Sequence, residues 1–226
     1  FMQLRDRAEF VSREMTSLNV SGVQRLHIGL LNRWSARPRS ARKLPMQFDG
    51  VVYRASFSPD SSQVVAGGDA RDTKVKIWNV KDSHVTRAFR HGSGVNNSTF
   101  SPDGSKIVTG SNDGVVRIWN LEKEGQLDLQ IDVGGNPAFV QFNQDGSRLL
   151  IRTLEGAIGV WDAASGFPLF EPLALNGDCS FSADGKLVIL GGSDGLVRLI
   201  DSETGDVSRM GTRHNSRISL SVSPSG

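Results

Sequence analysis

Apolar and polar residues alternate in short runs along the chain after residue 48, and turn-forming residues separate the runs. In one segment a run at 95–100 precedes Ser-Pro-Asp-Gly, a second at 106–109 precedes Asn-Asp-Gly, and a third occupies 115–119. Alternation bounded by such turns predicts antiparallel strands joined by tight connections. A weaker run at 127–131 predicts a fourth strand in the same sheet.

This pattern occurs four times, and each copy closes its first run with a phenylalanine. The four anchors lie 43, 42 and 39 residues apart along the chain, at Phe57, Phe100, Phe142 and Phe181. A period near 40 residues predicts a repeat architecture. One four-stranded sheet cannot bury both of its faces alone, so successive sheets are expected to stack around an axis.

The copies resemble the WD-repeat family. The family's Trp-Asp dipeptide is present as Trp161-Asp162, softened to Trp78-Asn79 and Trp119-Asn120, and reduced to Ile200-Asp201. The resemblance implies an all-β WD-repeat β-propeller, with about four blades visible of an expected seven. The expected blades are residues 48–90, 91–132, 133–171 and 172–212, with a partial fifth blade at 213–226. Either a longer protein or a second chain would complete such a ring.

The second copy matches the family pattern most fully. A histidine precedes its first strand by the expected spacing, and an aspartate lies in the turn before its third strand. In the family a His, a Ser or Thr, an Asp and the Trp form a buried chain of hydrogen bonds. By resemblance, the members of this structural network are His91, Thr109, Asp113 and Trp119.

The resemblance also implies where partners bind. In the family, proteins often dock on the face made by the loops between blades and the loops between second and third strands. The candidates on that face are Tyr53, Arg71, Asn96 and Asn112. The first copy has a two-residue insertion there, in GGDARDTKVK, which indicates either a binding loop or a longer solvated hairpin.

Residues 1–47 differ in composition from the repeats, and we expect a helical, basic leader or the tail of a preceding domain. They carry a net charge of +6, whereas residues 48–226 carry −4. Apolar residues at helical spacing predict an amphipathic helix near the start, at Leu4, Ala8, Val11, Met15 and Leu18. The basic contact candidates that follow are Arg33, Arg37, Arg39, Arg42 and Lys43. They indicate either a contact with nucleic acid, acidic lipid or an acidic protein face, or a solvated linker.

Little in the sequence points to catalysis or to a cofactor. Gly191–Gly195 matches the G-x-S-x-G pattern of serine hydrolases, but it lies between two predicted strands and not on the strand-to-helix turn that this chemistry needs. The four histidines are dispersed, and none has metal-ligand spacing to Cys179. No apolar run approaches about 18 residues, so no membrane span is expected. The single cysteine excludes an intramolecular disulfide and favours an intracellular, cytoplasmic location.

These observations favour a noncatalytic scaffold that holds other proteins on the rim of a propeller. A second interpretation is the sensor or regulatory propeller of a larger multidomain signalling ATPase or kinase. A third is an RNA-binding propeller, which would use the basic segment 33–43.

Overall fold

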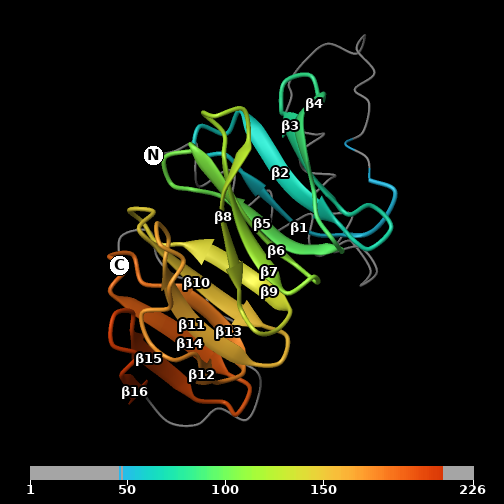
Figure 1. The fold of residues 1–226 in the computed structure, drawn as a ribbon. Coiled ribbons are helices and arrows are strands. Elements are labelled where there is room, and N and C mark those ends of the chain that lie inside the picture. The colour runs from blue at the N-terminus through green and yellow to red at the C-terminus, as the bar shows by residue number, and fades with distance from the viewer. Residues whose placement is uncertain (1–45, 47, 211–226) are drawn as a thin grey trace, which may run out of the picture. The chain divides into compact units, whose positions relative to one another are not determined.

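Each copy of the repeat folds into one antiparallel sheet of four strands (Figure 1). The computed structural model describes residues 46 and 48–210, and within them all regular structure is β. Sheet 1 contains β1 (Val52–Phe57), β2 (Gln63–Gly68), β3 (Lys74–Asn79) and β4 (Val85–Arg90). Sheet 2 contains β5 (Val95–Phe100), β6 (Lys106–Ser111), β7 (Val115–Asn120) and β8 (Gln126–Asp132). The expected all-β fold and the four expected strands of the second copy are confirmed.

Sheets 3 and 4 keep the same strand order. Sheet 3 contains β9 (Pro137–Phe142), β10 (Arg148–Thr153), β11 (Ala157–Asp162) and β12 (Leu173–Ala174). Sheet 4 contains β13 (Gly177–Phe181), β14 (Leu187–Gly192), β15 (Val197–Asp201) and β16 (Val207–Met210). Because β12 pairs with β11, sheet 3 extends past the expected blade limit at residue 171.

An aspartate holds the turn between the first and second strands in each sheet, and the residue after it has a positive φ: glycine in sheets 2, 3 and 4, and Ser61 in sheet 1. In sheet 2, Asp103 accepts hydrogen bonds from the Ser101 hydroxyl at 2.5 Å and from the Ser105 amide at 3.0 Å, and Gly104 has φ of 75°. Only glycine adopts that backbone conformation without a steric cost. The repeated aspartates are therefore turn formers, as the sequence indicates: Asp60, Asp103, Asp145 and Asp184.

The apolar core lies between successive sheets. Three buried clusters join sheet 1 to sheet 2, sheet 2 to sheet 3 and sheet 3 to sheet 4. Ile77, Ile107 and Leu149 have no exposed surface. Burying one such side chain stabilises the fold by about 1.5–3 kcal/mol, so stacking of the sheets is the main source of stability. The first strands lie at the inner edge, where β1 contacts β5 and β5 contacts β9.

Several sequence predictions fall outside the described residues. They are the amphipathic helix, the basic residues from Arg33 to Lys43, and the start of a fifth copy after residue 212. The division of the chain at residue 47 therefore stays a prediction.

Candidate functional site

Two rims of loops border the sheets, and each is held by a recurring backbone hydrogen bond. The entry rim consists of the segment that leads into each sheet and the turn between its second and third strands. An amide of that turn donates to a carbonyl of the entering segment in all four sheets. These bonds are Asp69 N to Val51 O at 3.0 Å, Asn112 N to Gly94 O at 2.8 Å, Leu154 N to Asn136 O at 2.8 Å and Ser193 N to Asn176 O at 2.9 Å.

Acidic side chains reinforce the entry rim. The Gly92 amide donates to Asp113 Oδ2 at 3.0 Å, and the Asn136 amide donates to Glu155 Oε2 at 2.9 Å. Burial favours the neutral form of Asp113, but hydrogen bonds from Arg117 and from the Gly92 amide outweigh that effect and lower the pKa of its carboxyl. The turn is thus tied to the entering segment by charge-assisted hydrogen bonds.

A basic residue four positions after the turn acid forms an ion pair in three of the sheets. The pairs are Asp72–Lys76 at 2.6 Å, Asp113–Arg117 at 2.9 Å and Asp194–Arg198 at 2.5 Å. Sequence reasoning missed these cations, although the spacing Asp-x-x-x-Lys/Arg recurs at one repeat position. In sheet 3 this position is Gly159, and the Trp161 ring lies where its side chain would be.

The structure brings three of the four expected network residues together in sheet 2. His91 Nε2 lies 2.8 Å from Thr109 Oγ1, and Trp119 Nε1 donates to the same oxygen at 3.1 Å. Thr109 is fully buried. Asp113 takes a different role from the expected one, because its carboxylate binds Arg117 and the Gly92 amide. Burial, and next the charge of Arg117, lower the pKa of His91 to about 4, so its imidazole is neutral at pH 7.

In sheet 1, aromatic contacts take the place of the hydrogen-bond network around the tryptophan. Phe48 takes the place of the histidine and meets Trp78 edge to face, with ring centroids 5.1 Å apart. Lys76 Nζ lies 4.4 Å from the centre of the Phe48 ring. Aromatic and cation–π contacts here replace the polar chain of sheet 2.

The predicted partner-binding residues lie on or beside the entry rim. Tyr53 is 54% exposed, and the Arg71 side chain is 66% exposed. Arg71 bonds to Asp69, with Nη2 at 2.9 Å from Oδ2. Asn96 and Asn112 are brought together, since Asn96 Nδ2 donates to Asn112 Oδ1 at 2.7 Å and to the Pro137 carbonyl at 3.1 Å. Tyr53, Arg71 and Asn112 are exposed, whereas Asn96 is half-buried.

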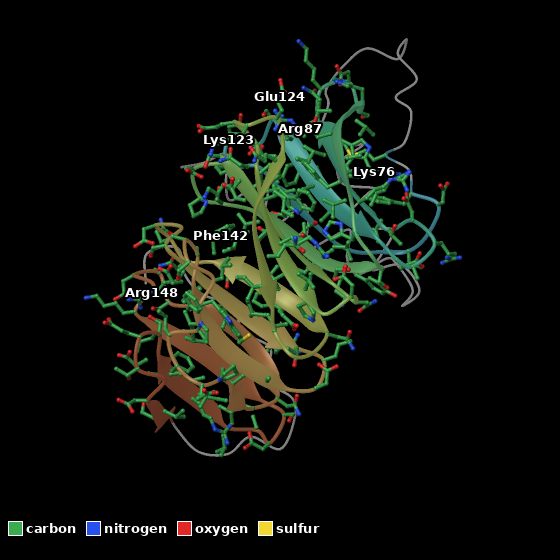
Figure 2. All side chains as sticks on the ribbon, in the orientation of Figure 1. Lys76, Arg87, Lys123, Glu124, Phe142 and Arg148 are labelled. Carbon is green, nitrogen blue, oxygen red and sulfur yellow. The ribbon has the colours of Figure 1, made fainter. Side chains whose placement is uncertain are left out.

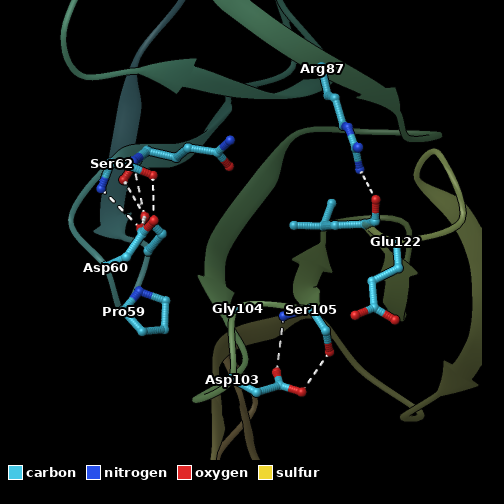
Figure 3. Close-up of a pocket in the computed structure, with 11 residues that line it drawn as sticks. Pro59, Asp60, Ser62, Arg87, Asp103, Gly104, Ser105 and Glu122 are labelled. Carbon is cyan, nitrogen blue, oxygen red and sulfur yellow. Dashed lines mark hydrogen bonds between the residues drawn. The ribbon is translucent and has the colours of Figure 1, made fainter.

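The second rim, called the turn rim here, consists of the turns between first and second strands and the connections between third and fourth strands. It holds a pocket of about 400 Å³ between sheets 1 and 2 (Figure 3). The charged residues in its lining are Asp60, Arg87, Asp103 and Glu122. Figure 2 shows Arg87 beside the connection that carries Lys123 and Glu124, and Arg87 Nη1 donates to the Leu121 carbonyl of that connection.

The polar groups of this pocket are largely engaged with the protein itself. Hydrogen bonds from the Ser58 hydroxyl, and then from the Ser62 amide and hydroxyl, lower the pKa of Asp60 to about 2. Asp103 is held in the same way by Ser101 and Ser105, which also lowers its pKa. Both carboxylates are ionised near pH 7 and shape the turns, so neither has the raised pKa of a general acid.

Other chemistry is sparse in the described part of the chain. Cys179 on β13 is a free, buried thiol, and burial raises its pKa to about 12, so it is not a nucleophile at pH 7. Gly191–Gly195 joins β14 to β15, as expected for a hairpin turn. Within residues 46 and 48–210, no group of His, Cys, Asp or Glu has the arrangement of a metal site. No helix in that region is long and apolar enough to span a bilayer.

Comparison with known proteins identifies the repeats. A sequence model of the WD domain, G-beta repeat family matches residues 42–79, 83–120 and 177–201. The matched segments are thus WD repeats, and the four sheets have the architecture of blades of a partial β-propeller.

The chain is similar to several curated WD-repeat relatives. It is 27% identical to the small ribosomal subunit protein RACK1y of Oryza sativa subsp. japonica, over 66% of this chain and 47% of that protein. It is 28% identical to the serine-threonine kinase receptor-associated protein of Dictyostelium discoideum, over 78% of this chain and 75% of that protein. It is 26% identical to the protein LST8 homolog of Drosophila melanogaster, over 67% of this chain and 53% of that protein. The chain spans about half the length of the rice and fly relatives.

Proposed function

We propose that this chain is a noncatalytic protein-interaction scaffold and that partners bind its entry rim. The observation that supports this most is the backbone hydrogen bond that recurs in all four sheets between the turn and the entering segment. It fixes the loops on a packed scaffold while their exposed side chains differ from sheet to sheet. Rigid loops bind with a small entropic cost, and varied side chains supply specificity.

Within the entry rim, Tyr53, Arg71 and Leu154 are the proposed contact residues. Leu154 is 61% exposed at the tip of the β10–β11 turn. Tyrosine and arginine are enriched at the energetic centres of interfaces. Arg71 is already oriented by two of its own nitrogens on Asp69, so less side-chain freedom is lost when a partner binds. Asn96 and Asn112 are proposed as polar contacts at the edge of this surface.

The names of two relatives support a protein-binding role. One is described as associated with a serine-threonine kinase receptor and another as a protein of the small ribosomal subunit. The regulatory propeller of a larger signalling enzyme remains an alternative, as does RNA binding through Arg33, Arg37, Arg39, Arg42 and Lys43. We also propose an intracellular location, which the single, free Cys179 supports.

A quantitative capture experiment tests the proposal. The intact protein, immobilised at equal amounts, is compared with the variant Arg71→Ala/Leu154→Ser and with the turn-rim control Lys81→Ala, and captured proteins are measured by mass spectrometry. We expect one set of partners to fall at least ten-fold with the entry-rim variant and to be unchanged with Lys81→Ala. Equal capture by all three proteins would reject the entry rim as the binding surface.

A further inference from the structure

At one position in the first strand of each sheet, the four repeats have four different residue types. Three residues before each anchoring phenylalanine the chain has Arg54, Asn97, Phe139 and Asp178. One residue before the anchors, by contrast, all four repeats have a small or amide side chain, and these bond in pairs between sheets. Ser56 Oγ lies 3.2 Å from Thr99 Oγ1, and Ser180 Oγ donates to Gln141 Oε1 at 3.3 Å. The shared position maintains the repeat, whereas the divergent position has no such architectural role.

A second departure from the repeat lies directly beside it. The second strands of the other sheets have glycine at one position, Gly67, Gly110 and Gly191, where β10 has Arg152. A side chain at this position would clash in sheet 1 and would be tightly packed in sheet 2. A Cβ on Gly67 would lie 2.6 Å from Val95 Cβ, and one on Gly110 would lie 3.0 Å from the Pro137 carbonyl oxygen. A long cation in place of glycine therefore needs a reason beyond packing.

One arginine packs on an aromatic ring, and the other lies opposite that aromatic residue on the neighbouring strand. Arg54 comes from sheet 1, and its Cζ lies 5.1 Å from the centre of the Phe139 ring in sheet 3. Arg152 is the direct register partner of Phe139 across β9 and β10. Directly opposed residues of an antiparallel pair have their Cβ atoms about 4.5–5.5 Å apart on one face of the sheet. Arg54, Arg152 and Phe139 thus form one cluster at the inner edge.

The cluster carries positive charge that the described residues do not neutralise. Neither Arg54 nor Arg152 forms an ion pair with an acid in the part of the chain that the structure describes. Arg152 Nε is buried and has no hydrogen-bond partner there, and neither has Oδ1 of the buried Asn97. Burial raises the pKa of the nearby Cys179 thiol, and the charges of Arg152 and Arg54 and a side-chain hydrogen bond with Arg152 oppose that rise. An unpaired buried donor is destabilising, and a ligand that accepts its hydrogen bond would remove that cost.

We propose that Arg54 and Arg152 form an oxyanion-binding site against Phe139 at the inner edge of the propeller. The ligand is a carboxylate or phosphate group, because the planar guanidinium binds both with two parallel hydrogen bonds. Phe139 supplies a flat wall that fixes Arg54. Asp178 is the acid at the same level in sheet 4, and it selects against a ligand that extends toward that sheet. The oxyanion comes either from an acidic segment of a protein partner or from free phosphate.

The test measures binding of two probes to the full chain at constant ionic strength. Inorganic phosphate and a hexaglutamate peptide are titrated by calorimetry, with sodium chloride as the blank. The variants are Arg54→Gln, Arg152→Gln and Arg152→Gly, the last of which restores the residue that the other three sheets carry. Arg90→Gln is the matched control, since it removes an exposed arginine of the edge strand β4. Thermal unfolding verifies that each variant is folded.

We expect at least one probe to bind the wild-type chain, with affinity at least ten-fold weaker in the Arg54 and Arg152 variants and unchanged in Arg90→Gln. Preference for hexaglutamate identifies a protein partner as the source of the oxyanion, and preference for phosphate identifies the free ion. Absence of binding by either probe, or equal binding by the arginine variants, overturns the proposal. Because partner capture is tested with Arg71 and Leu154, failure here is distinct from failure of the entry-rim function.

Discussion

Replacing Thr109 by valine should show how much the buried hydrogen-bond network in sheet 2 contributes to the free energy of unfolding. The two side chains have nearly the same shape, so the change removes one hydroxyl and leaves packing almost intact. That oxygen accepts from Trp119 Nε1 at 3.1 Å and lies 2.8 Å from His91 Nε2. His91 Nε2 then loses its partner in a buried site, and Trp119 Nε1 loses its partner in a half-buried one. Each orphaned group costs about 1–3 kcal/mol, so we expect Thr109→Val to lower the free energy of unfolding by about 2–4 kcal/mol.

The assay is urea unfolding followed by tryptophan fluorescence, with circular dichroism as a second probe. Thr99→Val is the matched control, because Thr99 lies in the same sheet but is half-buried and its hydroxyl bonds to Ser56 at 3.2 Å. We expect that control to cost less than about 1 kcal/mol. Sheets 1, 3 and 4 have Ala66, Ile151 and Leu190 at the position of Thr109. If Thr109→Val is no more destabilising than Thr99→Val, the network does not stabilise the blade.

Three further predictions concern His91, Asp113 and Arg71. The pKa of His91 is about 4 in the folded chain and 6.5 when the side chain is exposed. The unfolded chain therefore takes up more protons, and the free energy of unfolding falls as pH drops from about 6.5 to 4. This loss of unfolding free energy is about 3 kcal/mol. In urea unfolding across that pH range, the pH dependence of His91→Phe should be smaller by this amount, and an unchanged pH dependence would contradict the prediction. Asp113→Ala should cost about 2–4 kcal/mol in the same assay, since it leaves Arg117 and the Gly92 amide unpaired, and a neutral effect would refute that role. Arg71→Ala should change stability by less than about 0.5 kcal/mol, and a larger loss would make this residue structural.

The sequence was sufficient for the strands wherever alternation and turns agree. The strand predicted at 95–100 has the same bounds as β5, and the aspartate turns follow the Ser-Pro-Asp pattern. The fourth strand of sheet 3 was less predictable. Pro168 and Pro172 interrupt its pattern, and a proline cannot donate to the strand ladder, so β12 shrinks to Leu173–Ala174. The exposed Phe167 lies in the segment before it, at 71% exposure.

Contacts between repeats could not be predicted from the sequence. Resemblance suggested that Asp113 belongs to the His91 network, but Arg117 lies four residues away along the same hairpin and takes its carboxylate. Arg54 of the first sheet contacts Phe139 of the third sheet. No local sequence pattern predicts this contact. Such contacts depend on how the sheets stack, which one chain's periodicity does not specify.

Backbone amide hydrogen exchange of the intact protein tests the central claim most directly. The proposed function requires four equivalent sheets whose entry-rim turns are held by the amides of Asp69, Asn112, Leu154 and Ser193. We predict that these four turn amides exchange at least a hundred-fold more slowly than in an unstructured peptide, as do amides in the adjoining second strands. Turn amides that exchange at the rate of an unstructured peptide would contradict a rigid rim and the binding function proposed for it.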